Sequence, residues 1–156
     1  MPTSKAKYGT LTTIAITANT LAAGDARQSD KVQNLNRYLD LELLIGFTLA
    51  AGSPSDQSKV NLYLVPSPNG TNFPTPAGES DADITLDGGT PVEGHLVGFI
   101  NTPDAGQAYT GHLRSVLQYD EALALAPWWV LVVENRTGVA FTAFSAKYLG
   151  KQIEIA

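Results

Sequence analysis

Cysteine is missing from this sequence of 156 residues. Its absence excludes disulfide scaffolds, catalytic thiolates and metal sites built from thiolate ligands. Charged residues are scarce at 16%, and no apolar run approaches the roughly 20 residues that a membrane-spanning helix needs. The first ten residues, MPTSKAKYGT, contain no apolar stretch that would act as a signal peptide. We therefore expect a chain that is made in a cytoplasm, has no membrane partner and folds without a disulfide or a structural metal.

Recognisable catalytic motifs are missing as well. The sequence has no G-x-S-x-G element and no phosphate-binding glycine loop. Its two histidines, His95 and His112, lack metal-ligand spacing; Glu93 could share a strand face with His95, but no third ligand stands nearby. A pair of carboxylates brought together by folding stays open, since sequence alone does not show which acids meet. We expect no enzymatic activity, no cofactor and no metal at these histidines.

An acidic, glycine-rich segment lies in the middle of the chain. Asp81, Asp83 and Asp87 resemble a calcium-binding loop only loosely, because the EF-hand spacing is not met and no glutamate closes the site. A solvated acidic loop is the main interpretation, and a Ca²⁺ site in the Asp81–Asp87 loop is the alternative.

The residues that are present favour β-strands. Leu, Ile and Phe alternate with polar residues from Leu39 to Leu49, which is the period of two expected of a strand with one buried face. Further strands are expected over residues 11–17, 60–64, 96–100, 109–119 and, in two segments, 126–148. With 14 glycines and 9 prolines punctuating them, these segments predict an all-β fold: a single antiparallel β-sandwich, jelly-roll-like, with seven or eight strands. Residues 1–10 are expected to form a flexible, extended N-terminal arm, and residues 11–156 the sandwich domain.

The segment from Ala126 to Tyr148 is the most informative part of the chain. It predicts two buried strands joined as a hairpin by a turn at residues 135–138, with a bulge near Ala143. Residues 128–133 are apolar on both faces, so one face must be covered either by another part of this chain or by a neighbouring subunit. Trp128 and Trp129 must point to opposite faces, which favours a core position for one and a contact position for the other.

Charge is distributed unevenly along the chain, whose net charge is −5. From Val60 to Leu113 there is no Lys or Arg, whereas residues 1–37 carry five basic residues and two acidic ones. An acidic middle makes nucleic acid an unexpected partner. The pattern fits two solvated surfaces, or head-to-tail complementarity between copies or with a scaffold.

Two segments resemble one family of virion proteins. The segment VNLYLVPSPNGTNF (Val60 to Phe73) resembles a strand and hairpin common in small tailed-phage virion proteins, with Asn69 where Asp is usual. The closing strands resemble those of the same proteins at Pro127, Trp129, Val133, Asn135, Thr137, Gly138, Ala146, Lys147, Tyr148 and Gly150. The resemblance is to head decoration, or cement, proteins: jelly-roll sandwiches, often trimeric, that sit on the capsid lattice. The strong match covers about a quarter of the chain and consists of turn and core positions, which identify a fold more firmly than a role.

The resemblance implies a structural protein that binds the outside of a phage capsid and stabilises it. Its partners would be the major capsid protein and two further copies in a homotrimer, after synthesis in the host cytoplasm. The contacts expected are Lys5, Lys7 and Tyr8 of the arm together with the exposed member of the Trp128 and Trp129 pair.

Two other functions fit the same sequence. A carbohydrate- or receptor-binding module of a phage tail or fibre would use Tyr63, Phe73 or Trp128 as a stacking platform. A structural subunit of the tail or neck would differ mainly in its symmetry, with rings of six or twelve copies.

Overall fold

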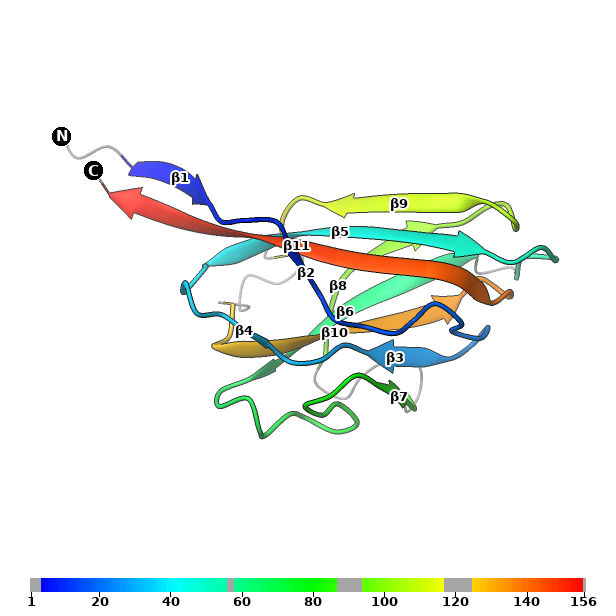
Figure 1. The fold of residues 1–156 in the computed structure, drawn as a ribbon, viewed down its shortest axis with the longest axis horizontal. Coiled ribbons are helices and arrows are strands. Elements are labelled where there is room, and N and C mark those ends of the chain that lie inside the picture. Colours follow the sequence, from blue (N-terminus) through cyan, green and yellow to red (C-terminus); the bar gives the residue numbers. More distant parts are fainter. Residues whose placement is uncertain (1–3, 56–57, 87–93, 117–124, 156) are drawn as a thin grey trace.

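The computed structural model describes residues 4–55, 58–86, 94–116 and 125–155, and these ranges form a β-sandwich in which all strand pairs are antiparallel (Figure 1). One sheet has the order β1-β11-β5-β9, with β2 also paired to β11; the other has the order β7-β3-β10-β6-β8, with β4 also paired to β10. The strands are β1 (Ser4–Tyr8), β2 (Thr12–Thr13), β3 (Ala26–Gln28), β4 (Val32–Gln33), β5 (Asp40–Leu49), β6 (Lys59–Ser67), β7 (Ala82–Ile84), β8 (His95–Asn101), β9 (Ala108–Leu113), β10 (Trp128–Arg136) and β11 (Phe141–Ile155). The predicted all-β sandwich is confirmed. Within these ranges no helix is long and apolar enough to cross a membrane.

The alternation predicted for residues 39–49 is confirmed in β5. Its side chains alternate strictly between buried and half-buried positions from Asp40 to Leu49. Leu39 is the exception, with 51% of its surface exposed. It precedes the strand and follows a turn in which Arg37 has a φ of 50°, so the chain enters the sheet one residue later than the pattern predicts.

The main core lies between the two sheets. Trp129, Leu131 and Val133 of β10 face the buried row of β5, and Trp129 makes an edge-to-face contact with Tyr148 at a centroid distance of 5.3 Å. Phe47 stacks between Tyr109 and Phe141. Each fully buried side chain of this size contributes roughly 1.5–3 kcal/mol, so this layer holds the sheets together.

A second core covers the outer face of β10. Val130 and Val132 pack with Tyr63, Val65 and Ala26 beneath a segment of the same chain, residues 68–86, which we call the strap. The strap residues that pack against this cluster are Phe73, Ala77, Ile84 and Leu86. The apolar segment 128–133 is therefore covered by another part of the same chain, which is the first of the two alternatives expected. No neighbouring subunit is needed to bury it.

The turn after β10 does not form a hairpin, so that prediction is wrong. β10 pairs with β3, β4 and β6, whereas β11 pairs with β1, β2 and β5 in the other sheet. The turn is an arch between sheets: the buried Asn135 side chain donates to the carbonyls of Leu21 and Val139, and Gly138 has a φ of 85°. These bonds satisfy buried carbonyl groups where the chain leaves one sheet. The predicted bulge is confirmed as a register shift between Phe141 and Ala143.

Two other predicted strands are shorter than expected. Of residues 11–17 only Thr12 and Thr13 pair as β2, because Ile14 turns into the core as the chain crosses to the other sheet. The strand predicted over 109–119 ends at Leu113, and residues 117–119 lie outside the described ranges.

Candidate functional site

A two-stranded ribbon extends the five-stranded sheet beyond the body of the sandwich. β1 pairs with residues 151–155 of β11, and we call this pair the terminal ribbon. Figure 1 shows it projecting beyond the sandwich, with both ends of the chain at its tip. Lys5, Lys7 and Tyr8 are all exposed, Tyr8 by 54%. Residues on both faces of β1 are therefore open to contact.

The base of the ribbon is fastened to the sandwich. The N–H of Gly9 donates to the carbonyl of Gly150 at 2.9 Å. Both glycines lie against the ring of Tyr38, closely enough that a Cβ on either would overlap it. Within the arm expected over residues 1–10, residues 4–8 form a paired strand on this base, and the flexibility of the arm stays a prediction.

The two adjacent tryptophans occupy different environments. Trp129 is only 2% exposed and belongs to the main core, so it is not available as a contact residue. Trp128 is half-buried on the outer side: Lys31 Nζ lies 5.3 Å from its ring centroid, and Gly70 of the strap packs on its face. The alternation predicted for this pair is present, and Trp128 is its partly exposed member.

The three aromatic residues suggested as a sugar platform differ in how far they are exposed. Tyr63 is 3% exposed, and its hydroxyl donates to Glu134 Oε2 at 3.0 Å. Phe73 packs against the second core from the strap. Burial, reinforced by the bond to Glu134, raises the pKa of Tyr63 to about 12. Its role is structural, which leaves the half-buried Phe73 and Trp128 as the two candidates of the three with exposed surface.

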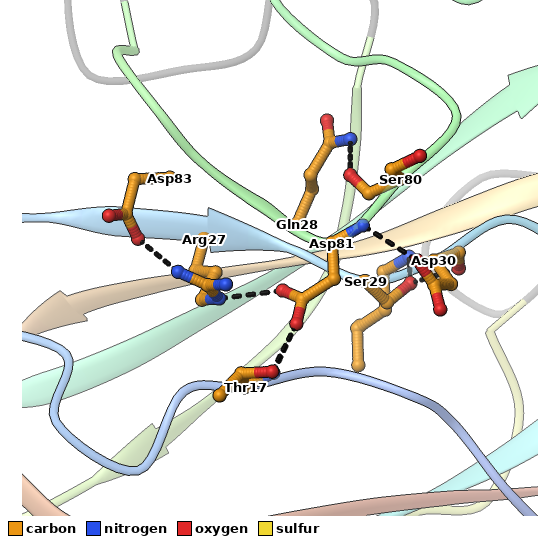
Figure 2. A network of polar contacts seen from close by, with 9 residues as sticks. Thr17, Arg27, Gln28, Ser29, Asp30, Ser80, Asp81 and Asp83 are labelled. Atoms are coloured by element: carbon orange, nitrogen blue, oxygen red, sulfur yellow. Dashed lines mark hydrogen bonds and ion pairs between the residues drawn. The ribbon is translucent and has the colours of Figure 1, made fainter.

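The acidic segment fastens the strap to the sandwich. Asp81 accepts from Arg27 Nε at 2.6 Å, from the backbone N–H of Thr17 at 2.8 Å and from the Thr17 hydroxyl (Figure 2). Asp83 binds the same guanidinium at 2.6 Å. Burial opposes ionisation of Asp81, but the bonds from Arg27 and Thr17 outweigh it and hold its pKa below the ordinary value. These bonds use both oxygens of Asp81, and Asp87 lies outside the described ranges, so the calcium alternative stays a prediction.

Among the described residues no group of three potential metal ligands is found, and Glu93, the possible companion of His95, lies outside those ranges. His112 Nε2 lies 2.6 Å from Glu42 Oε2, and Lys151 Nζ lies 3.0 Å from Glu42 Oε1. Burial tends to raise the pKa of Glu42, but the bonds to His112 and Lys151 lower it overall. This cluster lies on the outer face of the five-stranded sheet, where it joins β5, β9 and β11.

A buried polar network that the sequence analysis did not single out lies under the end of the strap. Glu134 is 4% exposed and accepts from Tyr63, from Asn61 Nδ2 at 2.8 Å and from Arg136 Nη1 at 2.9 Å. A cavity of about 540 Å³ opens beside Glu134 and Arg136. The sequence signal for this network is spacing: Asn61 and Tyr63 are two residues apart, as are Glu134 and Arg136. Each pair therefore shares one face of its strand, and the two strands are paired. Because the carboxylate is satisfied by its own neighbours, the network anchors the strap side of β10.

Comparisons with known proteins leave the family open. No protein-family model matches the chain, and a search of curated proteins finds no match. A solved structure of desmodium yellow mottle tymovirus aligns with 100% of this chain and 89% of its own, at 13% sequence identity and a TM-score of 0.34. A TM-score this low does not establish a shared fold, so no conclusion is drawn from it.

Proposed function

We propose that this chain is a structural virion protein that binds the outside of a phage capsid and stabilises it. Support comes from the resemblance of residues 60–73 and 126–148 to decoration proteins of tailed phages, together with a sandwich closed on both sides of β10. The strand order also supports the jelly-roll form of the sandwich. Successive strands β8, β9, β10 and β11 alternate between the two sheets, and the final strand lies between β1 and β5.

The observation that carries the proposal is the terminal ribbon. It stands clear of the body and presents Lys5, Lys7 and Tyr8 without any core of its own (Figure 1). An isolated two-stranded ribbon is marginally stable in water, so contact with a partner would add to its stability. The partner proposed is the major capsid protein, met by these three residues and by the open part of Trp128.

Each of these contacts is weak, but many of them together give a high overall affinity. An exposed lysine paired with a carboxylate contributes about 0–1 kcal/mol. A homotrimer would present three ribbons at once, and linked contacts of this kind raise the overall affinity without any new contact. Trimers on the capsid exterior are therefore the form of the protein that we propose.

The two other functions keep less support. A sugar-binding module would have to rely on the half-buried Phe73 and Trp128, since Tyr63 is buried. A tail or neck subunit would use the same sandwich in rings of six or twelve. No enzymatic activity is proposed.

The test is attachment to capsid shells of the phage that encodes the chain. Purified protein is mixed with shells that lack it, and the bound fraction is measured by co-sedimentation. We expect saturable binding and a higher temperature of shell disruption. Absence of binding to mature shells, together with tryptophan fluorescence that responds to glycans, would instead support the sugar-binding module.

A further inference from the structure

The strap begins with a tight turn that contains the only asparagine–glycine pair in the sequence, Asn69 and Gly70. Asn69 is exposed, whereas Gly70 is buried. In such a pair the backbone nitrogen of the glycine can attack the side-chain amide carbon of the asparagine and close a five-membered imide ring. Glycine leaves this nitrogen open to the attack because it has no side chain. A covalent change at this position would alter the charge of the strap.

The fold itself requires glycine at position 70. Gly70 has a φ of 74°, which lies in the left-handed region that favours glycine. A Cβ on Gly70 would lie 2.6 Å from an atom of the Trp128 ring. Any larger residue would therefore strain the turn and displace Trp128, so the unhindered nitrogen is a consequence of how the strap packs.

The turn holds the side-chain amide of Asn69 by its oxygen. Oδ1 accepts the backbone N–H of Thr71 at 3.0 Å and that of Asn72 at 2.9 Å, as asparagine does in an Asx turn. When the Gly70 nitrogen attacks Cγ of Asn69, negative charge develops on this same oxygen. Two donors already directed at the atom that becomes negative lower the energy of the intermediate.

The buried Ser67 contacts the attacking nitrogen. Its hydroxyl donates to the carbonyl of Asn72 at 2.7 Å, and its oxygen accepts the N–H of Gly70 at 3.0 Å. This second bond draws the proton away from the Gly70 nitrogen, which must lose it as it attacks. The turn therefore supplies both a proton acceptor at the nucleophile and donors at the oxygen of the group attacked.

We propose that Asn69 is a site of spontaneous modification, at which the folded chain converts its own asparagine to aspartate or isoaspartate. The bond from the Gly70 nitrogen to Cγ of Asn69 forms, the bond from Cγ to the amide nitrogen breaks, and ammonia leaves with the proton from Gly70. Water then opens the imide: attack at the Cγ carbonyl gives aspartate, and attack at the main-chain carbonyl gives isoaspartate. No electrons are exchanged with another molecule, and water, the only co-reactant, reaches Asn69 because its side chain is exposed.

Both products add a negative charge near Lys31, whose Nζ donates to the carbonyl of Gly70 at 2.9 Å. Aspartate can accept the same two backbone N–H groups, so it should preserve the turn. Isoaspartate adds a carbon atom to the main chain before Gly70 and should shift this glycine on the Trp128 ring. The modification thus acts on the start of the strap and is independent of capsid binding.

The test is the mass of peptides from the full chain after incubation at mildly alkaline pH. Because no Lys or Arg lies between Val60 and Leu113, the peptides are made with pepsin, in acid, where the imide forms slowly. We expect the peptide that contains Asn69 to gain about one mass unit, through the exchange of NH2 for OH. Peptides that contain the exposed Asn36 or Asn101 should keep their mass. Asn69→Asp supplies the aspartate standard, and Asn69→Gln, which would need a six-membered ring, should stay unchanged.

Two comparisons separate the effect of the turn from that of the asparagine–glycine pair alone. Asn69 should convert at least as fast in the folded chain as in the same chain unfolded in urea, because only the folded turn directs the N–H groups of Thr71 and Asn72 at its oxygen. Ser67→Ala, which removes the acceptor of the Gly70 proton, should convert more slowly than the unaltered protein. Conversion only in urea, or conversion in Ser67→Ala that is no slower than in the unaltered protein, would overturn the proposal.

Discussion

At the scale of single residues, the best-defined contact is the one between Asp81 and Arg27. The Asp81 side chain is 16% exposed, and it connects the strap to β3 and to the segment that contains Thr17 (Figure 2). Its pKa is lower in the folded chain than the ordinary value. A lowered folded pKa means that its stabilising contribution is complete above the unfolded pKa and is lost as the pH falls through the folded pKa.

We therefore expect Asp81→Asn to destabilise the protein at pH 7 by about 1–3 kcal/mol, the cost of removing a charged hydrogen-bond partner from a part-buried site. The difference from the unaltered protein should shrink in acid, because protonation removes the same charge. Urea unfolding at neutral and acidic pH measures both effects. Asp83→Asn is the control, since Asp83 binds the same arginine from a side chain that is 77% exposed; an equal loss in both variants would contradict the assignment.

The raised pKa of Tyr63 predicts that the stability of the protein falls at alkaline pH. Its pKa is raised from 10.0 to about 12 by burial and by Glu134. The unfolded state thus loses its proton first, so stability should be complete below about pH 10 and should fall as the pH rises toward 12. Tyr63→Phe should cost about 1–3 kcal/mol at pH 7 and should lack this particular alkaline loss. Parallel stability curves for the two proteins between pH 9 and 12 would argue against the buried hydroxyl–carboxylate contact.

Residue-level predictions from the sequence were correct where spacing alone decides. The buried row of β5 follows from its period of two, and the opposite orientation of Trp128 and Trp129 follows from their adjacency. Tyr63 was suggested as a sugar platform and is instead buried. No local signal shows that the strap, which directly follows β6, folds back over the outer face of that strand.

At the scale of elements, the β8 and β9 edges close on one another through two glycines. A Cβ on Gly98 would lie 2.3 Å from Leu113, and one on Gly111 would lie 2.3 Å from Ile100. Gly98→Ala and Gly111→Ala should each destabilise the protein by about 1–3 kcal/mol through overpacking. Gly78→Ala is the control, because its nearest contact, at 3.6 Å, is the side-chain amide of Gln28. Denaturant unfolding measures all three, and an equal, small effect in all of them would disprove the close packing.

The identity of most elements follows from the sequence, but their partners do not. The bulge in β11 is visible as a slip in the inward pattern. The turn at residues 135–138 has a hairpin composition and yet joins two sheets, because Asn135 is buried and bonds to carbonyls around residue 21. A turn within one sheet and a turn between two sheets have the same local sequence pattern. The sequence therefore does not show which sheet each strand joins.

At the scale of the whole molecule, the strap changes the argument for oligomers. The apolar outer face of β10 was one reason to expect a neighbouring subunit, and the strap covers that face within the chain. Among the described residues, β9 and the terminal ribbon lie at opposite ends of the five-stranded sheet. Because the outer face of β10 is buried within the chain, it gives no reason to expect a neighbouring subunit.

The terminal ribbon gives the last prediction. Deleting residues 1–8 should leave the sandwich intact, because β1 pairs with residues 151–155 at the end of β11, and keeping Gly9 preserves its packing on Tyr38. The thermal unfolding midpoint should therefore change little, while attachment to capsid shells should weaken. Lys5→Glu combined with Lys7→Glu should weaken attachment in the same direction, and more so at low salt, since exposed charges are screened as ionic strength rises. Lys147→Glu changes an exposed lysine of the same sheet outside the ribbon, so it controls for the effect of one such charge reversal elsewhere on the molecule. If the deletion variant binds shells as well as the full chain does, the ribbon is not the contact with the capsid.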